Sequence, residues 1–345
     1  MKMKVAQVGV ANFGGYRRER MRETGLFEIV AAYDLNAEAL RKCQAEDGAR
    51  PVSSYEELLA TPGIEAVVIS TGAKFHAAQT AAALARGLHV FVEKPLCATP
   101  GEIELLLQAQ RKAGRVVAVG HADHSSSKRS LHLKRLLADG FFGRLATFEM
   151  TIAHSGGLEI KEGDWRGDPE KNPGGMLFQC GCHGFHELMF LFGPIRRVSS
   201  MMRYDVHTTK TADVAHCILV FESGLIGTVS AYHVTPYRHT LHLFGTEQSL
   251  YIDDRAPSYG DANVIHSQKR GNCAAEPLLP FTLDEGGDAC GNLRSFYKAV
   301  REGGTPYPSL IDGARAVAVV FAAEESAKSG NAVAVPPSLG ERVMA

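Results

Sequence analysis

The sequence predicts an α/β protein with an N-terminal doubly wound parallel sheet and a C-terminal α/β domain built on a large, mostly antiparallel open sheet. Short apolar runs alternate with helical segments through the first part of the chain, an order typical of parallel sheets. From residue 196 onward, strand-like runs follow one another with glycine and charged residues between them. A length of 345 residues also exceeds what one hydrophobic core usually serves. We therefore expect two domains, residues 1–122 and residues 123–345.

The elements of the first domain follow from the apolar runs and the residues that bound them. Helices are expected where Ser, Thr or Pro begins a segment and Gly ends it. The apolar runs predict strands at 5–8, 29–33, 66–70, 89–92 and 116–119. The segments between them predict helices at about 55–59, 77–86 and 99–113. In the second domain we expect a helix at 128–139 and extended segments at 146–153, 196–207, 214–222, 226–235, 239–245 and 249–253.

Composition excludes several classes of protein. A net charge of −1 argues against nucleic acid or an anionic membrane as the main partner. No apolar run approaches the roughly 20 residues of a membrane span, and the apolar stretch before Asn12 is too short for a signal peptide. Seven cysteines without a C-x-x-C pair indicate reduced thiols. We therefore expect a cytoplasmic protein.

The first strand leads into a candidate cofactor loop. Residues 9–14 form G-x-A-x-x-G, one step from the dinucleotide fingerprint, whose glycines let the backbone approach a pyrophosphate. The second strand ends at Asp34, twenty residues after this loop, where a carboxylate can accept the ribose hydroxyls of NAD. No arginine follows directly to bind a 2′-phosphate, although Arg17 or Arg18 could reach over. NAD is thus favoured over NADP; the alternative is an ordinary tight turn with a capping aspartate.

A second candidate position lies at the end of the strand predicted at 89–92. The apolar run stops at Glu93-Lys94-Pro95. Ligands collect beyond the carboxyl ends of parallel strands, and burial can lower the pKa of a lysine toward the range useful for proton transfer. The alternative is a surface lysine beside its own counter-ion. Lys94 is therefore a candidate proton-transfer group.

The third candidate stretch is a helix expected from residue 176. Gln179, His183, His186 and Glu187 stand at i, i+4, i+7 and i+8, which places them along one helix face. A polar stripe on an otherwise apolar helix is costly to bury, so we expect it to line a cleft. His183 and Glu187 could also ligate a metal ion, but the sequence has no H-E-x-x-H and no clear third ligand. We predict no metal site.

The strand expected at 214–222 predicts self-association. His216, Ile218 and Val220 share one face of residues 214–221, and the other face is entirely apolar. Because both faces are largely apolar, the sheet should be covered twice, by helices on one side and by a second subunit on the other. We expect a homodimer or homotetramer.

Taken together, these stretches resemble the glucose–fructose oxidoreductase/inositol dehydrogenase (Gfo/Idh/MocA) family over nearly the whole chain. The resemblance implies a Rossmann domain, an α/β domain whose open sheet often forms the oligomer interface, NAD(P), and a reaction at a carbonyl carbon of a sugar or cyclitol. The motifs that carry it are residues 9–14, Thr71–His76, Glu93-Lys94-Pro95, Gly140 with Gly143, Trp165-Arg166, Gly174-Gly175, Gly181–His183, residues 296–300, Asp312-Gly313 and residues 330–333.

The resemblance also implies roles for individual residues. Lys94 matches the family lysine beside the nicotinamide and the reacting hydroxyl, and His183 matches the histidine that serves as acid/base or orients the substrate. Family members often have Asp where Gln179 and His186 stand, so Lys94 and His183 must manage protons without that relay. The expected cofactor contacts are Gly9, Ala11, Asn12, Phe13, Gly14, Asp34, Ser70, Thr71, Gly72, His76, Glu93 and Lys94. The expected substrate contacts are Gln179, His186, Trp165, Arg166, His121 and His124.

Three functions fit these residues. The favoured one is an NAD-dependent dehydrogenase of a sugar, sugar derivative or cyclitol, with Lys94 or His183 taking the hydroxyl proton. The alternative is an NAD-dependent glycoside hydrolase or lyase that works by transient oxidation, elimination and re-reduction, which extra histidines would suit. A cofactor-loaded sensor without catalysis is disfavoured by the intact Lys94 and His183. Accumulation of NADH with product distinguishes the first two.

Overall fold

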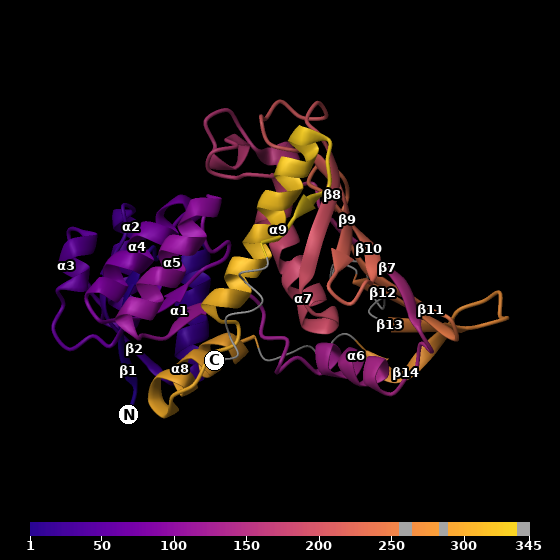
Figure 1. Cartoon of the computed structure of the whole chain (residues 1–345). Helices are drawn as coiled ribbons and strands as arrows, with labels where there is room; N and C mark the ends of the chain where they lie inside the picture. The colour runs from indigo at the N-terminus through magenta and orange to yellow at the C-terminus, as the bar shows by residue number, and fades with distance from the viewer. Residues whose placement is uncertain (255–263, 283–288, 337–345) are drawn as a thin grey trace. The chain divides into compact units, whose positions relative to one another are not determined.

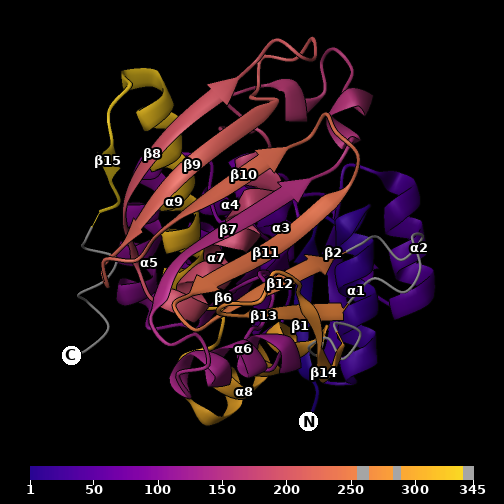
Figure 2. The same ribbon diagram turned by 90° about the vertical axis from the view of Figure 1, so that its right-hand side faces the viewer.

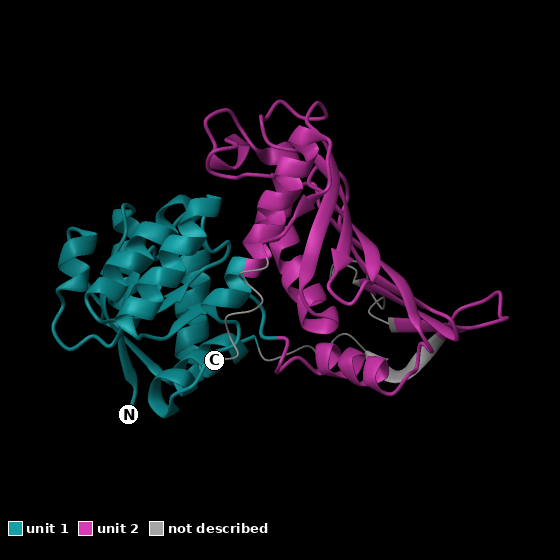
Figure 3. Cartoon of the chain, viewed as in Figure 1, with its two compact units in different colours: residues 1–123, 288–314 teal, residues 124–287, 315–345 magenta. Residues whose placement is uncertain are grey.

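The computed structural model divides into two compact units (Figures 1 and 3). The residues that it describes are 1–254, 264–282 and 289–336. The first unit comprises Met1–Asp123 and Asp288–Ala314, and the second His124–Gly287 and Arg315–Ala345. The domain boundary expected from the sequence places the segment Asp288–Ala314 in the second domain, whereas this segment belongs to the first compact unit. The assignment of cofactor binding to residues 1–122 and of substrate binding to residues 123–345 stays a prediction.

The first unit is built on a six-stranded sheet in the order β3-β2-β1-β4-β5-β6, with every described strand pair parallel. The doubly wound sheet expected from the sequence is thereby confirmed. Its strands are β1 (Met3–Val8), β2 (Phe27–Tyr33), β3 (Arg50–Pro51), β4 (Ala66–Ile69), β5 (His89–Val92) and β6 (Val117–Val119). Its helices are α1 (Phe13–Thr24), α2 (Ala37–Asp47), α3 (Tyr55–Leu59), α4 (Ala73–Ala85), α5 (Pro100–Ala113) and α8 (Gly291–Glu302).

The strand order fixes where a ligand can bind in this unit. From β1 the chain proceeds outward to β2 and β3, and then returns to the other side of β1 with β4, β5 and β6. In open α/β sheets, ligands bind beyond the carboxyl ends of the strands at this reversal. The loops that follow β1, β4 and β5 therefore lie where a cofactor is expected.

The second unit is built on a nine-stranded sheet in the order β14-β13-β12-β11-β7-β10-β9-β8-β15 (Figure 2). All its described strand pairs are antiparallel except β7 with β10. Its strands are β7 (Leu145–Ala153), β8 (Ile195–Arg203), β9 (Val214–Phe221), β10 (Ile226–Tyr232), β11 (Arg238–Gly245), β12 (Gln248–Asp254), β13 (Val264–Lys269), β14 (Glu276–Thr282) and β15 (Val333–Ala334). Its helices are α6 (Lys128–Ala138), α7 (Cys182–Phe192) and α9 (Leu310–Ser329, from Arg315 on).

Helices α7 and α9 cover one face of this sheet, behind the strands in Figure 2. Gly184 of α7 lies so close to Met150 of β7 that a Cβ would come within 2.7 Å of the sulfur atom. The backbone N–H of Ser200, in β8, donates to the Ser326 hydroxyl of α9 at 2.9 Å. On the opposite face, Ile218 of β9 is exposed in the single chain. Among the described residues, no helix is long and apolar enough to cross a membrane.

Candidate functional site

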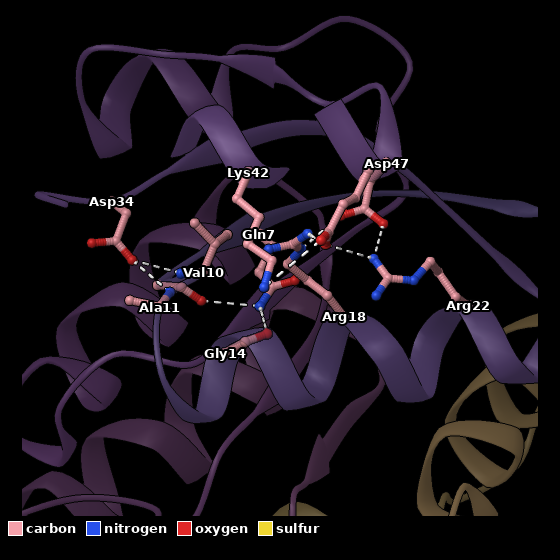
Figure 4. Close-up of polar contacts among 11 residues, drawn as sticks. Gln7, Val10, Ala11, Gly14, Arg18, Arg22, Asp34, Lys42 and Asp47 are labelled. Atoms are coloured by element: carbon pink, nitrogen blue, oxygen red, sulfur yellow. Dashed lines mark hydrogen bonds and ion pairs between the residues drawn. The ribbon is translucent and has the colours of Figure 1, made fainter. Parts of the chain in front are cut away.

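The loop between β1 and α1 is a tight turn that only glycine permits at two positions. Gly9 has a φ of 78°, and a Cβ there would lie 2.6 Å from the Ser70 carbonyl oxygen at the end of β4. A Cβ on Gly14 would lie 2.2 Å from the Gly9 carbonyl oxygen. The buried Gln7 Nε2 donates to the carbonyl oxygens of Gly9 and Gly14, both at 3.0 Å (Figure 4). Gln7 thus holds both ends of the loop. In the sequence it stands out only as a single amide side chain within an apolar strand.

Asp34 closes the same loop from the end of β2. Its Oδ2 accepts from the backbone N–H groups of Val10 at 2.7 Å and Ala11 at 3.0 Å (Figure 4). Its Oδ1 accepts from the N–H of Asn36 at 2.8 Å. A carboxylate has about four lone-pair sites, so one remains for a ribose hydroxyl without any loop amide being displaced.

The two arginines that could have served a 2′-phosphate are both engaged elsewhere. Arg17 and Arg18 are each 2% exposed. Arg17 Nε donates to Glu93 Oε1 at 2.6 Å, and Arg18 Nε donates to Asp47 Oδ2 at 2.6 Å. Each guanidinium is therefore held by a buried carboxylate, and a 2′-phosphate would have to compete with that ion pair.

A cavity of about 620 Å³ lies beside this loop, between α1 and α2. Two of the expected cofactor residues, Ala11 and Asn12, line it. It is lined by Val10, Ala11, Asn12, Gly15, Tyr16, Arg18, Glu19, Arg22, Asn36, Glu38, Ala39, Lys42 and Glu46. The cations that line it have carboxylate partners. Arg18 and Arg22 both bind Asp47, Arg22 at 2.6 Å, and Lys42 lies 3.7 Å from Glu46 (Figure 4). Each of these cations thus already has a carboxylate partner.

The turn that carries Lys94 is held by a buried histidine of α4. His76 Nδ1 lies 2.8 Å from the Pro95 carbonyl oxygen, and His76 Nε2 lies 2.9 Å from the Thr71 carbonyl oxygen. Burial lowers the pKa of His76, although both carbonyls oppose this effect. His76 therefore joins the loops after β4 and β5. Lys94 Nζ lies 6.0 Å from the centre of the Phe13 ring, at the start of α1.

In the second unit, the helix expected from residue 176 is not a regular α-helix. Leu177–Gly181 form a π-helical turn, and α7 begins at Cys182. A π turn bonds residue i to i+5, so the helix expected here is present but its first turn, which carries Gln179, is not α-helical. That Gln179 and His183 share one face stays a prediction. Both side chains are half-buried. π turns inside helices often mark functional sites.

The second half of the expected polar stripe is buried instead of lining a cleft. His186 is 2% and Glu187 4% exposed. Burial alone would raise the pKa of Glu187, but the charge of Arg129, its ion-pair partner, leads the effects that hold it below the usual value. The His186 ring lies 5.2 Å from the ring of His124, which is also buried. Partners from α6 and the segment before it thus compensate the buried polar groups.

The other expected substrate residues come from separate segments of the chain. Trp165 is exposed, and the Arg166 guanidinium pairs with Asp164. The Arg166 backbone carbonyl oxygen accepts from Asn172 Nδ2 at 2.7 Å, so this segment is anchored through its main chain. His121 is fully buried and belongs to the first unit, whereas the others belong to the second.

Two histidines that were not expected from the sequence pattern lie near the π turn. His154 and His233 follow the neighbouring parallel strands β7 and β10, whose last residues are paired. His154 Nε2 lies 3.7 Å from Cys180 Sγ, and His233 Nε2 lies 3.7 Å from the buried Asp213. Burial lowers the pKa of both histidines. Each histidine is a single residue that follows a strand, and such an isolated position does not indicate in the sequence that the two lie close together. Within the described ranges, no group of three or more His, Cys, Asp or Glu side chains is arranged to hold a metal ion.

Comparisons with known proteins match both parts of the chain. Residues 3–121 match a model described as an oxidoreductase family with an NAD-binding Rossmann fold, and residues 130–251 match the GFO/IDH/MocA C-terminal domain. The 1,5-anhydro-D-fructose reductase of Ensifer adhaerens is 26% identical over 92% of this chain and 94% of that protein.

Solved structures share the whole fold. A protein from Desulfitobacterium hafniense, described as a candidate NADPH-dependent oxidoreductase, superposes with a TM-score of 0.88 at 21% identity, over 98% of this chain and 99% of that one. Levoglucosan dehydrogenase, solved with NADH and levoglucosan, has a TM-score of 0.82 at 20% identity, over 97% of this chain and 100% of that one.

Proposed function

Because the chain belongs to the GFO/IDH/MocA oxidoreductase family and carries its NAD-binding Rossmann domain, we propose that it is an NAD-dependent dehydrogenase of a sugar, sugar derivative or cyclitol. The observation that carries the choice of cofactor is Asp34, bonded to the amides of the glycine loop. The substrate class rests on relatives named as a 1,5-anhydro-D-fructose reductase and a myo-inositol 2-dehydrogenase.

The residues of the first unit fit a dinucleotide. A side chain at Gly9 or Gly14 would occupy the space in which the loop turns, so the backbone there can approach a pyrophosphate. The remaining lone pair of Asp34 can accept one ribose hydroxyl. When bound, NAD accepts the hydride from the alcohol carbon.

In this proposal the chain itself handles the proton and the orientation of the substrate. Lys94 lies directly beyond β5, at the sheet edge where ligands bind, and takes the hydroxyl proton. His183 of α7 serves as a second acid/base group, and Gln179 of the π turn binds substrate hydroxyls. Gln179 cannot itself accept a proton from the substrate.

Replacement of Lys94 tests the proposal. We expect Lys94→Met to lower turnover by about 10²–10⁴, the usual contribution of a positioned proton-transfer group, while NAD binding and the fold persist. Lys112→Met, an exposed lysine of α5, should keep wild-type turnover. The assay follows NADH absorbance on a panel of monosaccharides, inositols and aryl glycosides. A Lys94→Met variant with full rate would contradict the role of this lysine, and aglycone release without NADH would favour the glycosidase.

A further inference from the structure

Arg17 forms a buried ion pair with the residue that precedes the candidate lysine. Its Nε donates to Glu93 Oε1 at 2.6 Å, and the two side chains are 3% and 4% exposed. Glu93 lies between the last residue of β5 and Lys94. Arg17 belongs to α1, the helix that starts at the glycine loop. The pair therefore connects the cofactor loop's helix directly to the turn that carries Lys94.

The guanidinium of Arg17 is fixed on its other sides as well. It lies 4.7 Å from the centre of the Phe91 ring and 5.9 Å from that of Phe13. Its Nη1 donates to Asn292 Oδ1 at 3.3 Å, and Asn292 Nδ2 donates to the His121 carbonyl oxygen at 2.7 Å. Arginine suits this place because its planar fork can donate in several directions while stacking on a ring.

Glu93 is equally constrained. Its backbone N–H donates to the Ile69 carbonyl oxygen at 2.9 Å. A Cβ on Gly120 would lie 2.4 Å from Glu93 Oε2, so the absence of a side chain at Gly120 makes room for the carboxylate. Arg17 thus binds one carboxylate oxygen of Glu93, and the Gly120 backbone lies against the other.

We propose that Arg17 is a positioning residue: by holding Glu93, it fixes the turn that aims Lys94 at the reacting hydroxyl. The inference rests on the proposed function, in which Lys94 takes the proton. Misplacement of a reacting group by about 1 Å can cost on the order of 10²-fold in rate. Stability alone does not require such a pair, because buried ion pairs can often be replaced by apolar side chains without loss of stability, whereas removal of one partner is strongly destabilising.

This difference provides the test. Variants Arg17→Met, Glu93→Met and the double variant are compared for thermal midpoint, NAD affinity, kcat and KM. We expect each single substitution to lower the thermal midpoint. The double variant should have the thermal midpoint and the NAD affinity of the wild type. The kcat of the double variant should stay at least about tenfold below wild type, with little change in KM. The pH profile of kcat should also be displaced in the double variant, because the proposed proton acceptor is no longer held in place.

An ion pair at the opposite edge of the same sheet supplies the control. Arg301 of α8 pairs with Glu65, which directly precedes β4 and so lies away from the loops that follow the strands. The double variant Arg301→Met with Glu65→Met should keep the kcat and the pH profile of the wild type.

Two results would overturn the proposal. One is a double Arg17→Met, Glu93→Met variant with wild-type kcat and pH profile. If that variant does not regain stability, Arg17→Met is assayed at a temperature where circular dichroism shows it fully folded, and wild-type kcat there overturns the proposal as well. If either result is found while Lys94→Met is inactive, only the positioning role of Arg17 is refuted, and the proposed role of Lys94 stands. An active Lys94→Met means that the proposed function of the lysine has failed.

Discussion

The Asp34 carboxylate already accepts three hydrogen bonds from backbone amides before any cofactor binds. We predict that NAD binds at least about tenfold more tightly than NADP, because juxtaposed like charges cost up to several kcal/mol and Arg17 and Arg18 are held in ion pairs. Asp34→Ser should narrow the difference mainly by improving NADP binding. Fluorescence titration with both cofactors measures this, and equal affinities in the wild type would contradict the assignment of Asp34.

His89 shows how a single side chain can make the fold sensitive to acid. Burial, with the charges of Arg115 and Arg301, lowers its pKa, and its Nδ1 accepts from the Val116 N–H at 3.0 Å. The unfolded chain therefore binds a proton at a higher pH, near 6.5. Stability from this group is fully present above that pH and is lost as the pH falls through it toward the folded-state pKa.

We accordingly predict that the urea concentration at the unfolding midpoint decreases when the pH is lowered from 7.5 to 5.5. His89→Gln should reduce that fall, because its amide oxygen can still accept from Val116 and does not protonate. Urea unfolding at both pH values measures the effect. An identical fall in wild type and variant would show that other groups, among them the buried His76 and His233 with their lowered pKa values, carry it.

At the scale of elements, the two proposed substrate-facing side chains belong to a π turn, which carries Gln179, and to α7, which carries His183. If Gln179 holds substrate hydroxyls and His183 handles the proton, their replacements should fail differently. Gln179→Ala removes neutral hydrogen bonds, each worth roughly 0.5–1.5 kcal/mol, so the loss should appear mainly in KM. His183→Ala should lower kcat and abolish a pH limb near the ordinary histidine value of about 6.5.

Steady-state kinetics across pH measure both variants. His132→Ala, on α6, serves as a histidine control outside the proposed machinery. Inactivation of the wild type by a chelator, together with stoichiometric bound metal in the purified protein, would replace the proton role of His183 by that of a ligand.

The elements themselves were largely predictable because their signals are local. The strands expected between residues 196 and 253 overlap β8 to β12, since alternation and turn residues are visible within a few positions. The π turn was not predictable, because apolar spacing over one turn does not separate i+4 from i+5 bonding. The partners of Arg17 and Glu187 were not predictable either, since 76 and 58 residues separate each from its counter-ion.

At the scale of the whole molecule, the large sheet presents an apolar face that the single chain leaves open. Met201 of β8 is 81% exposed, and Ile218 of β9 and Ile226 of β10 are each 50% exposed. Strand register places Met201 opposite His216 and Ile226 opposite Val220, so these side chains share the face that α7 and α9 do not cover. Large exposed apolar side chains on an open sheet face favour an interaction site there.

We therefore predict that the protein is a homodimer or homotetramer through this face. Light scattering after size exclusion should give a multiple of the 37.2 kDa chain mass. Ile218→Lys should shift the protein toward the monomer, because a lysine at the interface would have to lose its hydration without a partner. The control Leu105→Lys introduces the same charge at an exposed apolar residue of α5 and should leave the molecular mass unchanged. A wild-type monomer at tens of micromolar would instead assign the open sheet face to a different partner.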